Sequence, residues 1–242
     1  MAGPPQQLPL VAQRMAEIRA RALVCRDCPL AQTRTQVVFG DGNPDTPLML
    51  IGEGPGEQED ATGVPFVGRA GQLLEEALRV HRITRKHVWI SNVLKCRASL
   101  IEGGRVQNRP PRVEEVEACR QWIESEIAVI NPLVIVCIGG PAAKLIIDKN
   151  FSISSQRGQW FTQTGYAPYV MAVLHPAYIL RQQGQEFLRG KQCLIDDLAK
   201  VRQKVIEAKK EREEGRLPQF VPFRRPEAPE PPPSAQQASL FD

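Results

Sequence analysis

The sequence lacks a run of eighteen consecutive apolar residues, and its first residues, MAGPPQQLPLVAQ, lack the basic start and the sustained apolar segment of a secretory signal. These absences argue against a membrane span and a secretory leader, and we expect a cytoplasmic protein. A strong excess of one charge is also missing, because 31 basic residues face 27 acidic ones for a net charge of +4. This small excess permits nucleic-acid binding without indicating it.

The chain is long enough for one sizeable core, with 242 residues of which 42% are hydrophobic. We expect residues 1–19 to form an N-terminal extension and the start of a first helix, and residues 20–206 to form one globular domain. Residues 207–242 are expected to be a charged helix end and a disordered tail, because seven of the 21 prolines fall after position 217.

Short β-branched and apolar runs alternate with helical patterns along the body of the chain. The expected strands lie at 47–52, 87–91, 133–140 and 169–174, and the expected helices at 68–80, 112–130 and 141–148. This alternation predicts an α/β protein, a three-layer α/β/α sandwich around a central four-stranded, mainly parallel sheet. Ligands of such sheets bind beyond the carboxyl ends of the strands, here the loops after Gly52, Ser91, Gly140 and Leu174.

The six cysteines fall into two groups. Cys137 lies inside an apolar strand pattern and Cys193 on a helical pattern, so we expect both to be buried, inert thiols. Without a secretory signal, metal or cluster ligation explains the other four better than disulfides do. They are one C-x-x-C knuckle and two lone cysteines, a layout that suits an iron–sulfur cluster better than a zinc ribbon, although zinc and unrelated thiols stay open: Cys25, Cys28, Cys96 and Cys119.

A glycine-rich, acidic segment, GEGPGEQEDATGVPFVGRAGQLL, spans residues 52–74. Backbone amides near a helix start can bind phosphate, and a plain loop between strand and helix is the simplest alternative. Neither a P-loop lysine nor a G-x-G-x-x-G pattern is present. The segment also carries four carboxylates that would repel a polyphosphate: Glu53, Glu57, Glu59 and Asp60.

Four motifs follow one another in order: GEGPGEQED at 52–60, GVPFVGRAGQLL at 63–74, SNVLKCR at 91–97 and HPAYILR at 175–181. Together with the four cysteines, they resemble the family 4 uracil-DNA glycosylases, the iron–sulfur type of bacteria and archaea, over about residues 20–205. The resemblance implies an α/β/α fold, a 4Fe-4S cluster and the hydrolytic release of uracil from DNA, which leaves an abasic site for base-excision repair.

The resemblance also implies roles for individual residues. Phe66 stacks on uracil, Asn92 reads the base edge, and His175 contacts uracil O2. An amide at Asn92 can accept from N3–H and donate to O4, whereas cytosine presents this pair reversed. Cys25, Cys28, Cys96 and Cys119 would hold the cluster.

Backbone amides near Gly52 and Gly54 would join His175 in stabilising the departing uracil anion. Glu53 is the first choice to orient water and to stabilise the cationic sugar, and Glu59 is placed at the pocket wall against a thymine methyl. A wedge that fills the hole left by the flipped base is expected among Tyr178, Ile179 and Leu180.

Basic side chains near these motifs are candidate phosphate contacts, although any one of them is equally well explained as a solvated surface charge: Arg69, Lys95, Arg97 and Arg181.

The sequence departs from the family pattern at two places. The best-known glycosylases of the superfamily have an aspartate where Gly54 stands. The segment ASLIEGGRVQ, residues 98–107, is longer than the usual proline-rich link. A related branch traps DNA through a histidine on this loop, but no histidine lies between His87 and His175.

The chain ends QASLFD, which resembles the pentapeptide that binds bacterial sliding clamps, with Gln237, Leu240 and Phe241 as its anchors. A short apolar anchor on a proline-rich tether can dock while the enzyme searches nearby DNA. An inert tail is the alternative.

Three functions are weighed. The first is a monomeric uracil-DNA glycosylase acting on the chromosome, in the nucleoid. The second is a non-catalytic or polymerase-associated DNA-binding module with a glycosylase-like fold, and the third is a zinc-stabilised interaction protein. The joint presence of Glu53, Phe66, Asn92 and His175 favours the first.

Overall fold

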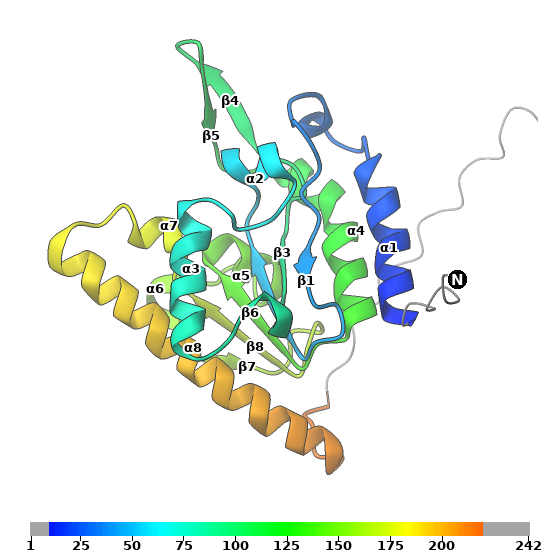
Figure 1. Cartoon of the computed structure of the whole chain (residues 1–242), viewed down its shortest axis with the longest axis vertical. Coiled ribbons are helices and arrows are strands. Elements are labelled where there is room, and N and C mark those ends of the chain that lie inside the picture. Colours follow the sequence, from blue (N-terminus) through cyan, green and yellow to red (C-terminus); the bar gives the residue numbers. More distant parts are fainter. Residues whose placement is uncertain (1–9, 220–242) are drawn as a thin grey trace, which may run out of the picture.

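In the computed structural model, which describes residues 10–219, one mixed sheet runs through the molecule in the order β1-β3-β2-β6-β8-β7 (Figure 1). Its four central strands are parallel and are the four that the apolar runs predict: β3 (Trp89–Asn92), β2 (Leu48–Gly52), β6 (Val134–Ile138) and β8 (Tyr169–Val173). The sheet has six strands rather than four, because β1 (Asp41–Gly42) and β7 (Trp160–Phe161) add antiparallel edges. Two-residue strands are too short to show a period.

Helices cover both faces of the sheet, which confirms the three-layer α/β/α prediction. One face packs against α1 (Leu10–Leu23), α4 (Val113–Ile130) and α5 (Gly140–Ile146). The other packs against α3 (Arg69–Val80), α7 (Pro176–Ile179) and α8 (Gly184–Glu213). Four short helical turns complete the described part: η1 (Pro29–Gln32), α2 (Glu57–Thr62), η2 (Arg85–His87) and α6 (Ile153–Gln156).

Strand side chains alternate between the two layers, as the twofold repeat of a strand requires. In β2, Met49 and Ile51 belong to the core beneath α4, whereas Leu48 and Leu50 belong to the core beneath α3 and α8. Because both faces are covered, β2, β6 and β8 are apolar along their length, and only β3 ends in polar residues, Ser91 and Asn92. No helix within residues 10–219 is long and apolar enough to span a membrane.

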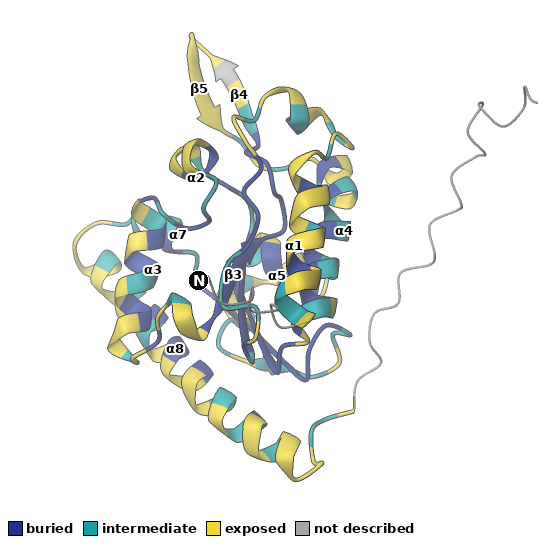
Figure 2. Ribbon diagram, turned by 45° about the vertical axis from the view of Figure 1, so that its right-hand side comes forward, coloured by how far each residue is buried: buried dark blue, intermediate teal, exposed yellow. Residues whose placement is uncertain are grey.

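The segment after Cys96 forms a separate antiparallel hairpin, β4 (Ser99–Glu102) and β5 (Arg105–Asn108), which projects from the body near α2 (Figures 1 and 2). Gly103 and Gly104 make its turn with φ values of 57° and 75°, the left-handed conformation that two-residue hairpin turns need. The longer link that the sequence shows is therefore an ordered ribbon.

Helix α8 continues across position 207. Ala208 is fully buried, and the Tyr169 hydroxyl donates to Glu211 Oε2 at 2.6 Å. The charged end of this helix is thus packed against the sheet as far as its last turns. Residues 220–242, which hold most of the proline-rich tail with Gln237, Leu240 and Phe241, and residues 1–9 lie outside the described residues.

Candidate active site

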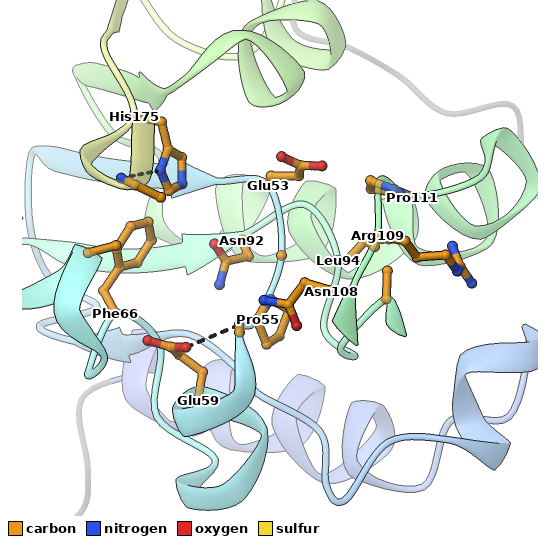
Figure 3. Close-up of a pocket in the computed structure, with 15 residues that line it drawn as sticks. Glu53, Pro55, Glu59, Phe66, Asn92, Leu94, Asn108, Arg109, Pro111 and His175 are labelled. Carbon is orange, nitrogen blue, oxygen red and sulfur yellow. Dashed lines mark hydrogen bonds between the residues drawn. The ribbon is translucent and has the colours of Figure 1, made fainter. Parts of the chain in front are cut away.

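A cavity of about 240 Å³ opens beyond the carboxyl ends of β2, β3 and β8 (Figure 3). It brings together six residues that the motifs predict, although they come from three separated stretches of chain: Glu53, Gly54, Glu59, Phe66, Asn92 and His175. We call it the base pocket. The loop after Gly140, the fourth that we expected at the site, instead lines a neighbouring groove that shares Glu53 with the base pocket.

Gly52, the last residue of β2, makes room for two of these side chains. A Cβ at this position would lie 2.3 Å from Asn92 Oδ1 and 2.6 Å from Phe66 Cζ. Only glycine permits this close approach. Gly54 is less constrained, since a Cβ there would meet Leu94 Cβ at 3.3 Å. A side chain such as the aspartate of other glycosylases would therefore press on Leu94.

The loops after β2 and β3 run side by side, because the Val93 N–H donates to the Gly52 carbonyl and the Leu94 N–H to the Glu53 carbonyl, both at 2.9 Å. Asn92 is thereby held at the floor of the base pocket with 2% of its surface exposed. Its Oδ1 is buried and has no hydrogen-bond partner among the described residues. An orphaned buried acceptor is costly, and it suits a ligand N–H.

Phe66 has a left-handed backbone with φ 54°, a strained conformation for an aromatic residue. Arg85 holds its carbonyl through a hydrogen bond of 2.8 Å, and the next two N–H groups, of Val67 and Gly68, donate to Glu59 Oε1. These bonds fix the backbone that carries the Phe66 ring, whose centroid lies 6.1 Å from that of the His175 ring.

The four carboxylates of the acidic segment divide by their partners. Glu59 accepts backbone N–H groups at both oxygens, the second from Gly56 at 3.1 Å, and so organises the loop that carries Phe66. Asp60 accepts the Thr35 N–H, and Glu57 is exposed. Glu53 lines the base pocket and has no hydrogen-bond partner within residues 10–219.

His175 is held as a specific tautomer. The Ala177 N–H donates to its Nδ1 at 3.0 Å, so a neutral ring carries its proton on Nε2. Burial lowers the pKa of His175 to about 4, and the positive charge of Arg181 acts in the same direction. The imidazole is therefore a neutral donor at pH 7.

Burial raises the pKa of Glu53, and Arg181 partly opposes this by favouring the carboxylate. Arg181 is exposed, and its positive charge lowers the pKa of both Glu53 and His175. Two neighbouring titratable groups with shifted pKa values are typical of reaction centres.

Two predicted phosphate contacts are wrong, because Lys95 and Arg97 point inward. Lys95 is 1% exposed, and its Nζ lies 2.8 Å from Glu126 Oε1 and donates to Ser91 Oγ and to the Asn92 carbonyl. Arg97 is 8% exposed and donates to Asn108 Oδ1 at 2.7 Å.

Asn108 and Arg109 line the base pocket, and the motifs did not single them out for it. Asn108 ends β5 and Arg109 follows it, and the sequence motifs do not indicate that this part of the chain returns to the pocket mouth. Glu115 of α4 holds Arg109 through two hydrogen bonds, of 2.6 and 2.8 Å.

Of the three residues predicted as the wedge, Ile179 is excluded, and Tyr178 and Leu180 remain. Ile179 is fully buried against α8, where Gly190 makes room for it, and so it belongs to the core. Tyr178 is 49% exposed beside the pocket, and Leu180 is half-buried.

A second, nearly closed cavity is lined by all four predicted cluster cysteines: Cys25, Cys28, Cys96 and Cys119. We call it the cysteine cavity. Arg34 Nη1 donates to Cys96 Sγ and the Lys95 N–H to Cys119 Sγ, each at 3.2 Å. Burial raises the pKa of the Cys119 thiol to about 12, and Lys95 opposes this.

The arrangement of thiols bears on the kind of centre. In the part of the chain that the structure describes, no three His, Cys, Asp or Glu side chains are grouped closely enough to hold a single metal ion. Four thiols line one cavity, and N–H donors point at two of their sulfurs, which is the donor set that an iron–sulfur cluster takes. Of the remaining cysteines, Cys137 is fully buried as expected, whereas Cys193 is only half-buried.

Comparison with known proteins defines the class to which this fold and pocket belong. Residues 39–199 match the model of the uracil DNA glycosylase superfamily. The type-4 uracil-DNA glycosylase of Thermotoga maritima is 42% identical over 78% of this chain and 93% of its own. The enzyme of the same name from Archaeoglobus fulgidus is 38% identical over 69% of this chain and 84% of its own. The chain belongs to the type-4 uracil-DNA glycosylase family of this superfamily.

Proposed function

We propose that the protein is a monofunctional uracil-DNA glycosylase that flips deoxyuridine out of DNA, hydrolyses its N-glycosidic bond and so initiates base-excision repair. The observation that carries the proposal is the unpaired, buried Oδ1 of Asn92, which lies in one small pocket with Phe66, His175 and Glu53. The type-4 relatives support the same reaction.

Recognition of the base follows from three side chains. Phe66 offers a ring held in place for stacking, which contributes roughly 1–3 kcal/mol per base. Asn92 Oδ1 accepts the uracil N3–H while its amide donates to O4. Cytosine would leave buried polar groups unpaired at about 1–3 kcal/mol each.

Bond cleavage transfers the electron pair of the C1′–N1 bond to uracil, and the sugar becomes an oxocarbenium-like cation. The Nε2–H of neutral His175 donates to uracil O2, where the negative charge develops. A neutral donor suits this role. Because the pKa of His175 is about 4, the ring carries no extra proton to give to uracil before the bond breaks. The hydrogen bond from Nε2–H to O2 becomes stronger as negative charge forms on O2.

Water then adds to C1′, and Glu53 in its carboxylate form orients this water and accepts its proton. This proton then passes from Glu53 through solvent to N1 of the uracil anion, so the products are neutral uracil and an abasic site. Gly54 leaves this position without the aspartate found in other branches, so Glu53 is the residue to which we assign water activation.

We further propose that Cys25, Cys28, Cys96 and Cys119 hold a 4Fe-4S cluster. When bound, the cluster would cross-link the loop after α1, the loop after β3 and helix α4 through these cysteines. It takes no part in hydrolysis in this proposal, because none of the four thiols lines the base pocket.

The remaining assignments extend the same function. Because the substrate is DNA, we propose that the protein acts in the cytoplasm, at the nucleoid. We also propose that it is a monomer. The tail residues Gln237, Leu240 and Phe241 are proposed to bind the sliding clamp. Tyr178 and Leu180 are proposed as the wedge.

The direct test is incubation with end-labelled oligonucleotides that contain U opposite G, U opposite A or unpaired U, followed by alkali. We expect strand cleavage at uracil, reduced about 10²–10³-fold by His175→Ala. His87→Ala is the matched control, because His87 lies in η2 and does not line the base pocket. Intact strands from an iron-loaded wild-type protein that still binds DNA would favour the DNA-binding module instead.

A further inference from the structure

The β4–β5 hairpin is rooted at the mouth of the base pocket. Ala98 before the ribbon, Asn108 at its end and Arg109 after it all line that pocket. The root is fixed by the Arg109 N–H, which donates to the Ala98 carbonyl at 3.0 Å, and by the bonds from Arg97 to Asn108 and from Arg109 to Glu115. The ribbon therefore stands at a defined place beside the entrance.

The outer part of the hairpin has side chains without a role in the fold. Leu100 is 40% exposed and Val106 is 51% exposed, and Arg105 makes no ion pair with any described residue. Ser99 pairs with Asn108 and Leu100 with Gln107, so residues two apart share a face of the ribbon. Val106 thus lies on the same face as Asn108, whereas Leu100 and Arg105 lie on the other.

The dimensions of the ribbon matter for a macromolecular substrate. Strands of four residues extend roughly 13 Å at about 3.3 Å per residue. A nucleotide held in the base pocket brings the flanking nucleotides to the pocket mouth. The grooves of the duplex are roughly 6–12 Å wide, so a projection of this size lies against or within one of them. Two-stranded ribbons fit DNA grooves, and exposed apolar side chains pack against sugars and base edges there.

We infer that the β4–β5 hairpin is a DNA-contacting ribbon that grips the duplex flanking the uracil nucleotide. Val106 packs on the side toward the extruded nucleotide, and Arg105 meets a backbone phosphate. The occupant is DNA because the ribbon is continuous with the pocket proposed to receive the nucleotide, on which this inference rests. Tyr178, which is 49% exposed on α7, directly follows Ala177, which lines the same pocket, so α7 offers a second exposed side chain close to the pocket.

The test measures binding separately from chemistry. The full chain is titrated by fluorescence anisotropy with oligonucleotides that contain 2′-fluoro-deoxyuridine, which resists hydrolysis, as a duplex and as a single strand. In one variant, residues 100–107 are replaced by a two-residue Asn-Gly turn, which keeps Asn108 in place. We expect duplex binding to weaken about tenfold and single-strand binding to change less than about twofold.

Point variants sharpen the result. Val106→Ser is expected to weaken duplex binding about threefold, whereas Val80→Ser, at the far end of α3 with 59% exposure, leaves it unchanged. Arg105→Gln is expected to reduce the slope of log Kd against log salt by about 1. An unchanged melting temperature shows that each variant is folded.

Equal losses on duplex and single strand, or no loss on the duplex, would overturn the inference. Loss of self-association in sedimentation, with DNA binding unchanged, would also overturn it and assign the ribbon to a second copy of the chain. Excision of uracil by the wild-type protein decides the proposed function independently. A protein that binds through the ribbon but releases no uracil would refute the glycosylase alone.

Discussion

The base pocket and the cysteine cavity lie at the two ends of one short segment. Asn92 lines the first and Cys96 lines the second. The two regions differ in whether their polar groups already have hydrogen-bond partners within the protein. In the cysteine cavity, Arg34 and Lys95 already donate to two of the four sulfurs, those of Cys96 and Cys119. In the base pocket, Asn92 Oδ1 and the Glu53 carboxylate accept no hydrogen bond from any described residue, and Glu53 interacts only with the charge of Arg181. Two of the thiols proposed to hold a permanent cluster are hydrogen-bonded in the folded chain, whereas the acceptors proposed to bind a transient ligand are left open.

The largest expected effect comes from removing the open acceptor. Asn92→Ala should lower kcat/KM for uracil excision about 10³-fold without lowering the melting temperature, because Oδ1 makes no hydrogen bond that the folded protein would lose. Single-turnover excision and thermal denaturation measure the two effects.

Asn43→Ala is the opposite control, since Asn43 Nδ2 donates to the Lys86 carbonyl away from the pocket. It should lose a little stability and no activity. A melting temperature that falls more for Asn92→Ala than for this control would contradict the contrast between open and satisfied groups.

Lys95 lies in the segment between the two regions, and a substitution there tests the ion pair that it forms with Glu126. Lys95→Met leaves the carboxylate of Glu126, which is fully buried, without its cation, and should cost about 3–5 kcal/mol of unfolding free energy in urea. The double variant with Glu126→Leu should recover much of this loss, because an apolar pair replaces both charges. Equal instability of the single and double variants would show that the ion pair is not the cause.

A smaller effect concerns acid stability. The pKa of His175 is about 4 in the folded protein, below the ordinary 6.5, so the unfolded chain binds more protons between these values. Stability is therefore lost as the pH falls from 6.5 toward 4, by roughly 2–3 kcal/mol in all. Urea unfolding at pH 7 and pH 4.5 should show a smaller loss for His175→Ala than for the wild type, and identical losses would refute this.

The smallest effect is a displacement of the pH profile. Arg181→Met removes a cation that lowers the pKa of both Glu53 and His175, so both pKa values should rise. The acid limb of the profile of kcat against pH should then move to higher pH, while Arg212→Met, at the end of α8, leaves it in place. Movement to lower pH would contradict the assignment of Glu53 as the base.

The site could be predicted from the sequence where a strand delivers the residue. Parallel strands end at one edge of the sheet, so Glu53, Asn92 and His175 had to meet once the strands were recognised. Lys95 and Arg97 follow the same strand, but their partners come from elsewhere. Nothing local to Lys95 shows that Glu126, 31 positions later, faces it from α4.

Two other differences have local causes. Ile179 lies in a single helical turn, which is too short to reveal which side faces the core. The β4–β5 hairpin did carry a signal, because Gly103 and Gly104 stand between β-branched and polar residues in the pattern of a tight turn. Reading that pair as a turn would have predicted the ribbon.

Because Gly52 has no side chain, mutations of its codon have a particular consequence. Every missense change of one base in a glycine codon introduces a residue with a Cβ, and a Cβ here would collide with both Asn92 and Phe66. Only the silent changes at the third base of the codon therefore leave the pocket intact. Loss of uracil repair could arise in a lineage through this one position, while every residue proposed to touch the base remained unaltered.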